Sequence, residues 1–499
     1  MLTQFFARKP IAGETDRGLI RTLGAGDLVM LAIGAVIGAG IFSSLGTAAA
    51  GEIARDGTVI RAGAGPALIL SFLLLGAVCG LAALCYAELA SMIPQAGSAY
   101  AYTYATLGEM LAWIIGWDLI LEYAVGNIAV AVAWSGYFVS LLSGIGITLP
   151  PWLTHGYLQA TTSNDPAVHG LLESAPHLFG LPIILNVPAF AIVALITWLL
   201  LRGVRESARA NNIMVAIKLA VLALFVIVGV QHINPANYVP FAPNGFRGIH
   251  QGAAIVFFAY IGFDAVSTAA EETKNPQRNL PIGILGGLAI CTLIYVIVGA
   301  VATGIVPYQQ LAASDPLARA LELAGLRTTS WIVAAGAVVS LSAVLLVFQY
   351  GQPRIFFGMA KDGLMPRWAA KVHPKTRVPH ITTIITGIFV GLGALGAEEN
   401  MIYDLTNIGT LAAFALVCVG VLVLRIREPE RPRGFRVPFI WFVAPAGAAA
   451  CIFVMIGLPR TAWERFGIWL LLGVVLYFAY GFRHSVLRTG REVAADVLD

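Results

Sequence analysis

Long apolar stretches alternate with short polar segments over most of this 499-residue chain. A transmembrane helix needs about 20 predominantly apolar residues, because the hydrocarbon core of a bilayer is about 30 Å thick. The pattern therefore predicts an all-α membrane protein with twelve transmembrane helices. They are expected near 26–46, 66–92, 110–143, 183–201, 209–231, 248–269, 281–305, 329–357, 381–397, 401–425, 438–458 and 463–482.

The composition excludes an ordinary soluble domain. Apolar residues make up 58% of the chain and charged residues only 12%, whereas soluble domains carry about 25% charged residues. The five cysteines all fall in apolar stretches without CxxC spacing, so neither a disulfide framework nor a zinc site is indicated. The polar N-terminal segment runs to Asp27 and leads into a full-length apolar stretch, which does not fit a cleavable signal peptide.

The distribution of positive charge predicts the orientation in the membrane. Of the 31 Lys and Arg residues, 23 fall in the two terminal segments and the loops on their side, and 7 fall in the loops on the other side. Lys218 is the remaining one and lies within an apolar stretch. Because cytoplasmic loops carry the excess of Lys and Arg, the protein is predicted to lie in the cell membrane with both termini in the cytoplasm.

The first apolar stretch contains three glycines within seven residues, Gly34, Gly38 and Gly40. Each Gly costs a helix about 1 kcal/mol relative to Ala, so a cluster at mid-membrane depth indicates backbone that unwinds. Unwinding would leave free N–H groups at the positive end of the half-helix that follows, which suits an anion such as a carboxylate. The alternative is close helix packing, since Gly34 and Gly38 fit the small-xxx-small pattern.

A second interrupted span favours the unwound interpretation. Gly262 lies two residues before an acid, Asp264, inside the apolar stretch 248–269, five spans after the glycine cluster. Corresponding breaks in the two halves of a chain are typical of transporters built from inverted repeats, with the binding site between the breaks.

Several segments resemble signatures of the amino acid–polyamine–organocation (APC) superfamily. Residues 34–42 (GAVIGAGIF) resemble its helix 1, and residues 86–90 (YAELA) and 94–100 (PQAGSAY) resemble its helix 2 and the following loop. Residues 257–264 (FFAYIGFD) and 271–278 (EETKNPQR) resemble its helix 6 and the cytoplasmic exit of that helix. Residues 116–123 (GWDLILEY) and 354–364 (RIFFGMAKDGL) resemble the cationic amino acid transporter (CAT) branch, in its bacterial type with twelve spans.

The resemblance, which extends from Leu23 to Pro438, implies a LeuT-like fold. Helices 1–5 and 6–10 would form inverted repeats, with helices 1 and 6 broken. The chain would divide into a cytoplasmic N-terminus (1–25), a transport core (26–425), helices 11 and 12 with a preceding basic loop (426–482), and a cytoplasmic tail (483–499). The implied activity is secondary active transport of small neutral or cationic L-amino acids by proton-coupled symport.

The same resemblance places an amino acid between the two broken helices. Its carboxylate would meet the backbone of helix 1 and its ammonium group the carbonyls of helix 6, which agrees with the charge preference of half-helix ends. Near the substrate side chain, Glu122 would favour a cationic group, whereas Leu341 would shorten the pocket and favour a small neutral one. The backbone contacts are expected at Val36, Ile37, Gly38, Ala39 and Gly40 in helix 1 and at Phe258, Ala259 and Ile261 in helix 6.

Lys218 lies near the middle of the stretch 209–231. A lysine at that depth costs about 2.5–3.5 kcal/mol on insertion scales, so it should face the protein interior and have a partner. The resemblance implies that its ammonium group stands where sodium-coupled relatives hold a sodium ion. Because burial favours the neutral form of a lysine, Lys218 could carry the coupled proton. The alternatives are an ion pair that only holds helices together, or a lysine that snorkels to the membrane surface.

Four carboxylates also fall within the predicted spans. Asp118 and Glu122 are four residues apart and therefore on one helix face, where two ionised groups repel each other. Either one is protonated, or a cation lies between them and another group, or both form hydrogen bonds to neighbouring helix ends. Glu88 and Asp264 are interpreted as gate or structural contacts.

Other function classes lack their motifs. The chain contains no HExxH, GxSxG or GxxxxGK[ST], which argues against an enzyme or an ATP-driven pump, and no repeated selectivity filter of a channel. Segment 144–182 is expected to be an ordinary exposed loop, because the spacing of His155, His169 and His177 matches no metal site. The expected partners are an amino acid, protons and lipid, with no cofactor, metal or nucleic acid. The alternatives to a proton-coupled symporter are an amino acid exchanger of the same fold and a non-transporting sensor.

Overall fold

The computed structural model describes residues 7–9, 22–93, 98–203, 208–374, 376 and 378–490. Most of the predicted N-terminal segment 1–25, positions 94–97 of the motif after helix 2, and residues 491–499 of the predicted tail lie outside these ranges.

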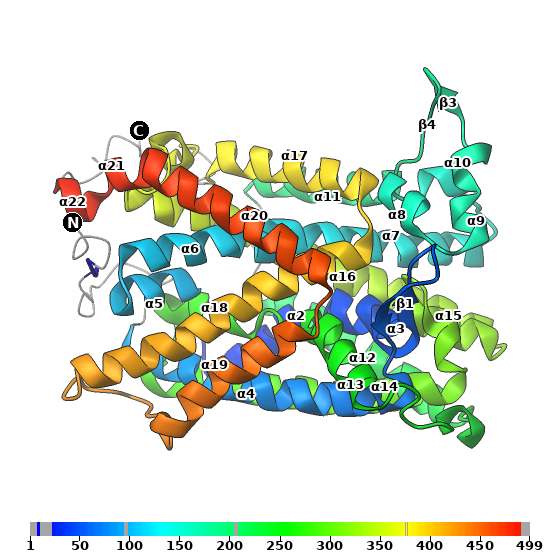
Figure 1. The fold of residues 1–499 in the computed structure, drawn as a ribbon, viewed down its shortest axis with the longest axis horizontal. Helices are drawn as coiled ribbons and strands as arrows, with labels where there is room; N and C mark the ends of the chain where they lie inside the picture. The colour runs from blue at the N-terminus through cyan, green and yellow to red at the C-terminus, as the bar shows by residue number, and fades with distance from the viewer. Residues whose placement is uncertain are drawn as a thin grey trace.

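The described chain is a bundle of long helices that run roughly along one axis (Figure 1). Eight helices in these ranges are long and apolar enough to cross a membrane, or nine if the bent pair around residue 38 counts as one span, and three more apolar helices are shorter. The prediction of an all-helical, multi-span membrane protein is therefore confirmed. Each predicted stretch overlaps one helix or a pair of helices: α2 (Ala25–Val36) with α3 (Leu45–Ala50), α4 (Leu68–Met92), α6 (Glu109–Ile120) with α7 (Gly126–Gly144), α11 (Val187–Leu201), α12 (Ala208–Val230), α13 (Gly245–Val256), α14 (Pro276–Ile305), α16 (Arg327–Lys361), α17 (His380–Gly396), α18 (Glu399–Arg427), α19 (Ile440–Ile456) and α20 (Arg460–Leu476). The second half of the stretch expected near 248–269 continues beyond α13 as 3₁₀ segments.

Small residues let the central helices approach closely. α14 packs against both α2 and α4. A Cβ atom added to Gly287 of α14 would lie 2.2 Å from Cβ of Ala32, and one added to Gly283 would lie 2.6 Å from Cβ of Leu28. Helices in lipid gain little from the hydrophobic effect and associate through such close packing. The glycines of α14 thus fix the position of α2 directly before its break.

Short elements cover one end of the bundle. They include the antiparallel hairpins β1 (Gly51–Ile53) with β2 (Val59–Ala62), and β3 (His177–Leu178) with β4 (Leu181–Pro182) (Figure 1). Segment 144–182, predicted as a plain loop, also forms α8 (Tyr157–Thr162), α9 (Pro166–His169) and α10 (Leu171–Ser174). The rings of His155 and His169 hydrogen-bond to backbone carbonyls. The same end of the molecule carries α15 (Pro316–Leu323).

The described parts of both termini meet at the opposite end. Lys9 forms an ion pair with Asp362 at 2.6 Å, and the amide of Val486 donates to the Asp362 carbonyl at 3.1 Å. The last helices, α21 (Phe482–His484) and α22 (Val486–Thr489), and also α5 (Ser98–Thr106), lie at this end (Figure 1). Two chain ends on the same side of the bundle are what an even number of spans produces.

Candidate functional site

The first predicted break is present in the described backbone. α2 ends at Val36, Ile37 is extended, and the chain resumes as a π-helical turn (Gly40–Ser44) that continues into α3, with a bend of 45° between the two parts. In a continuous helix the carbonyls of Gly34 and Val36 would accept from the amides four residues later. Instead, Lys218 Nζ donates to the Gly34 carbonyl at 2.5 Å, and the Tyr295 hydroxyl donates to the Val36 carbonyl at 2.9 Å.

Two backbone amides at this break lack helical hydrogen-bond partners among the described residues. Within the described chain, the N–H groups of Gly38 and Ala39 donate no hydrogen bond to another backbone group. The carbonyl of Gly38 accepts from Ile41 and Phe42 at 3.2 Å and starts the next helical segment. Free amides at a helix start carry partial positive charge, so this backbone is suited to bind a carboxylate.

The second break lies beside the first. α13 ends at Val256 and tightens into a 3₁₀ turn (Phe257–Tyr260), after which Ile261 is extended and Gly262 has a φ of +109°. That left-handed conformation favours glycine. A Cβ atom added to Gly262 would lie 3.0 Å from the Ala35 carbonyl oxygen, and one added to Gly40 would lie 2.1 Å from Cα of Ala259. The two breaks therefore pack backbone against backbone, at Gly40 with Ala259 and at Gly262 with Ala35.

Three further helices surround the breaks. Leu341 of α16 is fully buried, and Val344, one turn further along, would lie 3.1 Å from a Cβ atom at Gly38. The Phe258 ring packs on Tyr403 of α18 at 4.6 Å between centroids. Sequence reasoning missed Val344, Tyr403 and Tyr295, because an apolar or aromatic residue inside a span carries no signal that distinguishes a site wall from ordinary packing.

Glu122 lies in a second π-helical turn (Leu121–Val125) between α6 and α7. Such turns occur frequently at functional sites. Its carboxylate is buried and accepts a hydrogen bond from Thr410 of α18 at 3.3 Å, while its second oxygen has no partner among the described residues. Asp118, at the end of α6, is also buried, and its Oδ1 atom has no partner in the same part of the chain.

The remaining predicted carboxylates occupy other surroundings. Asp264 is buried two residues after Gly262, at the start of a 3₁₀ segment (Phe263–Glu272). Glu88, near the end of α4, accepts from Arg425 at 3.0 Å, from Arg433 at 3.1 Å and from the Val437 amide at 2.7 Å. These contacts join α4 to the last turn of α18 and the segment after it.

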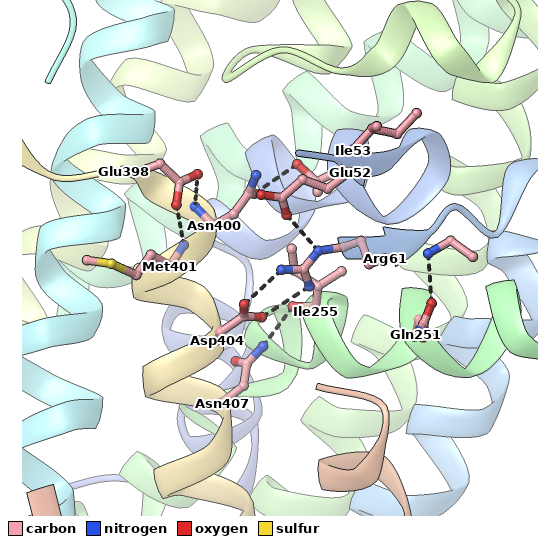
Figure 2. Close-up of polar contacts among 12 residues, drawn as sticks. Glu52, Ile53, Arg61, Gln251, Ile255, Glu398, Asn400, Met401, Asp404 and Asn407 are labelled. Carbon is pink, nitrogen blue, oxygen red and sulfur yellow. Dashed lines mark hydrogen bonds and ion pairs between the residues drawn. The ribbon is translucent and has the colours of Figure 1, made fainter. Parts of the chain in front are cut away.

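The first turns of α18 contact the end of α13, at the end of the molecule that carries the β1–β2 hairpin, which we call the hairpin end (Figure 2). Asn407 donates to the carbonyls of Ala254 and Ile255, both at 2.9 Å, at the end of α13. Glu398 caps α18 by accepting from the amides of Asn400 at 3.1 Å and Met401 at 2.8 Å. The end of α18 is thus attached to the segment that leads into the second break.

Glu398 is expected to make the stability of the fold pH-dependent. Burial and the neighbouring Glu52 raise the pKa of Glu398 from 4.5 to about 7. A carboxyl group with a raised pKa contributes stability that is complete below pH 4.5 and is lost as pH rises through 7. The apparent melting temperature of the purified protein should therefore fall between pH 5 and pH 8, and less steeply in Glu398→Gln. Glu173→Gln, at an exposed position, is the control; equal slopes in all three proteins would contradict this assignment.

Comparison with known proteins gives a consistent result. The family model described as "Amino acid permease" matches residues 23–478. The chain is 44% identical to the methylthioribose transporter of Bacillus subtilis (strain 168), over 97% of this chain and 100% of that protein. It is 45% identical to the branched-chain amino acid permease BcaP of the same organism, over 95% of this chain and 96% of the relative. It is 38% identical to the chloroplastic cationic amino acid transporter 9 of Arabidopsis thaliana, over 84% of this chain and 69% of that protein.

Proposed function

The chain belongs to the amino acid permease family, and from this membership we propose that it is a secondary active transporter that moves L-amino acids across the cell membrane by proton symport. The observation that carries the proposal is the juxtaposition of the two helix breaks. Free amides at Gly38 and Ala39 would bind the substrate carboxylate, and carbonyls of Phe258, Ala259 and Ile261 would bind its ammonium group.

We propose a LeuT-like arrangement of twelve spans for this chain. Counting the bent pair as one span, the nine long spans and the three shorter apolar helices give the required number within the described residues. The breaks fall in the first and sixth of these, as inverted repeats of five helices require. The excess of Lys and Arg in the segments on the side of the termini supports a cytoplasmic location for both chain ends.

Lys218 is proposed as the proton carrier. It is 1% exposed and donates to the Gly34 carbonyl, which the break frees from its helical partner. A charged ammonium group binds that carbonyl strongly, whereas a neutral amine binds it weakly. Loss of the proton would therefore release this contact and allow the two parts of helix 1 to move relative to each other.

The substrate is proposed to be an amino acid with an apolar side chain. Leu341, Val344 and Phe258 offer apolar surface beside the breaks, and the relative BcaP is named for branched-chain amino acids. Glu122 favours the other class, because its buried carboxylate would bind a cationic side chain. The methylthioribose transporter adds an uncharged, non-amino-acid compound to the candidates.

Uptake by the purified protein in proteoliposomes tests coupling and substrate together. Labelled leucine, alanine, arginine and methylthioribose would each be offered with an inward proton gradient, an inward sodium gradient, or neither. The proposal is supported if a proton gradient drives uptake of leucine or alanine and excess arginine inhibits that uptake only weakly. A preference for arginine would assign selectivity to Glu122. Sodium-driven uptake, or uptake that requires amino acid inside the vesicles, would replace proton symport by sodium symport or exchange.

A further inference from the structure

Arg61 is a buried arginine at the hairpin end of the molecule (Figure 2). It lies on β2, its side chain is 2% exposed, and it forms two parallel hydrogen bonds to Asp404 of α18 at 3.1 and 2.8 Å. Its Nε atom donates to Glu52 of β1 at 2.8 Å. Bidentate pairing of a guanidinium with a carboxylate is strong and directional. One guanidinium thus joins the hairpin to α18 and balances two carboxylates.

The same part of α18 holds the second half of helix 1. Glu399 accepts from the Ser43 hydroxyl at 2.5 Å, and Asn400 accepts from the Thr47 hydroxyl at 3.0 Å. Ser43 and Thr47 follow the first break directly. One face of α18 therefore contacts the outer half of helix 1, through Glu399 and Asn400, and the end of α13, through Asn407.

The hairpin is attached to α13 as well. The Ala62 amide on β2 donates to the Gln251 side chain of α13 at 2.7 Å (Figure 2). With Arg61 paired to Asp404, the hairpin, α13, α18 and the outer half of helix 1 form one connected layer over the breaks. Beneath it, Ile37, Ala39 and Ala259 are each at most 1% exposed. A substrate arriving from the hairpin end can reach the breaks only if this layer separates.

From these contacts, and on the basis of the proposed transport function, we infer that Arg61 is a positioning residue whose pairing with Asp404 and Glu52 holds the outer side of the substrate site closed. Removing the guanidinium leaves two adjacent carboxylates with no counter-ion from Arg61, one of them in the protein interior. Such carboxylates repel each other and gain hydration by moving apart. Loss of Arg61 therefore shifts the population toward states open on the hairpin side.

The test measures access to the site from outside in intact cells. Ala39→Cys, at the first break, reports access by its rate of reaction with a membrane-impermeant methanethiosulfonate. The protein without this substitution gives the background from the five native cysteines, which are buried. Adding Arg61→Ala to the reporter is expected to raise the labelling rate at least tenfold. Arg61→Lys, which keeps the charge but loses the bidentate geometry, should give an intermediate increase.

A matched control removes another arginine at the same end of the molecule. Arg319 pairs with Glu322 on α15, and both side chains are about half exposed, at 47% and 53%. Arg319→Ala should leave the labelling rate unchanged. If Arg61→Ala does not fold, Arg61→Lys and the uncharged pair Arg61→Gln with Asp404→Asn carry the test. The lysine variant should still label faster than the parent.

Two outcomes would overturn the inference: an unchanged labelling rate in folded Arg61 variants, or an equal increase in Arg319→Ala. The assay requires no transport, so its result is separate from that of the proposed function. Active uptake by the parent protein together with unchanged labelling in the Arg61 variants would contradict only the role of Arg61. Absence of uptake of any amino acid would contradict the transport proposal and leave the labelling result intact.

Discussion

Replacing Lys218 with Met is expected to reduce uptake driven by a proton gradient at least tenfold, while exchange across the membrane continues. Met has a similar length but carries no proton, and the Gly34 carbonyl loses the donor that it has at 2.5 Å. An unsatisfied buried carbonyl costs about 1–3 kcal/mol, so the variant should also melt at a lower temperature. Proteoliposome uptake with and without a proton gradient, beside counterflow at equal pH, separates the two activities.

Lys218→Arg separates a fixed charge from a proton carrier. Arginine keeps a donor for the Gly34 carbonyl but does not lose its proton in proteins. Lys218→Arg is therefore expected to fold and to lose proton-driven uptake, as the Met variant does. Lys274→Met removes an exposed lysine after the 3₁₀ segment Phe263–Glu272 and should behave as the parent protein. Proton-driven accumulation in Lys218→Arg equal to that of the parent would show that the lysine supplies only a charge.

Gly40→Ala is expected to reduce uptake by about a hundredfold. The added Cβ atom would lie 2.1 Å from Cα and 2.3 Å from the amide nitrogen of Ala259. These are backbone atoms that cannot rotate away, so the two breaks must separate and the substrate contacts on both sides must move. An error of about 1 Å in the position of binding groups can cost about a hundredfold. Initial uptake rates are the measurement, with the melting temperature recorded in parallel.

A matched pair of glycines controls for the general effect of adding a methyl group in a helix. A Cβ atom at Gly80 of α4 or at Gly358 of α16 would meet nothing within 4 Å. Gly80→Ala and Gly358→Ala should therefore transport as the parent does and melt at the same or a slightly higher temperature. Gly40→Ala uptake within twofold of the parent would contradict the close packing of the two breaks.

The sequence predicted the positions of the helices well, because an apolar run of membrane length is a local property of the chain. The stretch expected near 401–425 is α18, Glu399–Arg427, and the stretch expected near 110–143 is α6 with α7. The π-helical turn that contains Glu122 was not predicted, since it has no sequence signature. It also alters the turn between Asp118 and Glu122, so a shared face cannot be derived from their spacing of four alone.

The candidate site was predictable where a residue type is costly in a membrane. Three clustered glycines predicted an unwound backbone segment, and a lone lysine at mid-span predicted a functional charge. The partner of Lys218, a carbonyl 184 positions away, could not be predicted from local sequence. Arg61 and Asp404 are 343 residues apart. A signal for their region existed in the spacing of Asn400, Asp404 and Asn407, which places three polar groups on one face of the helix.

The most direct test of the central claim, that the two helix breaks form the binding site of an amino acid carrier, is counterflow in proteoliposomes. Vesicles containing purified protein and a high internal concentration of unlabelled leucine would be diluted into a trace of labelled leucine, with Gly40→Ala and Gly80→Ala measured in parallel. We expect transient, saturable accumulation of label in the parent and in Gly80→Ala, and its loss in folded Gly40→Ala. Non-saturable flux, or no flux with any amino acid, would contradict it.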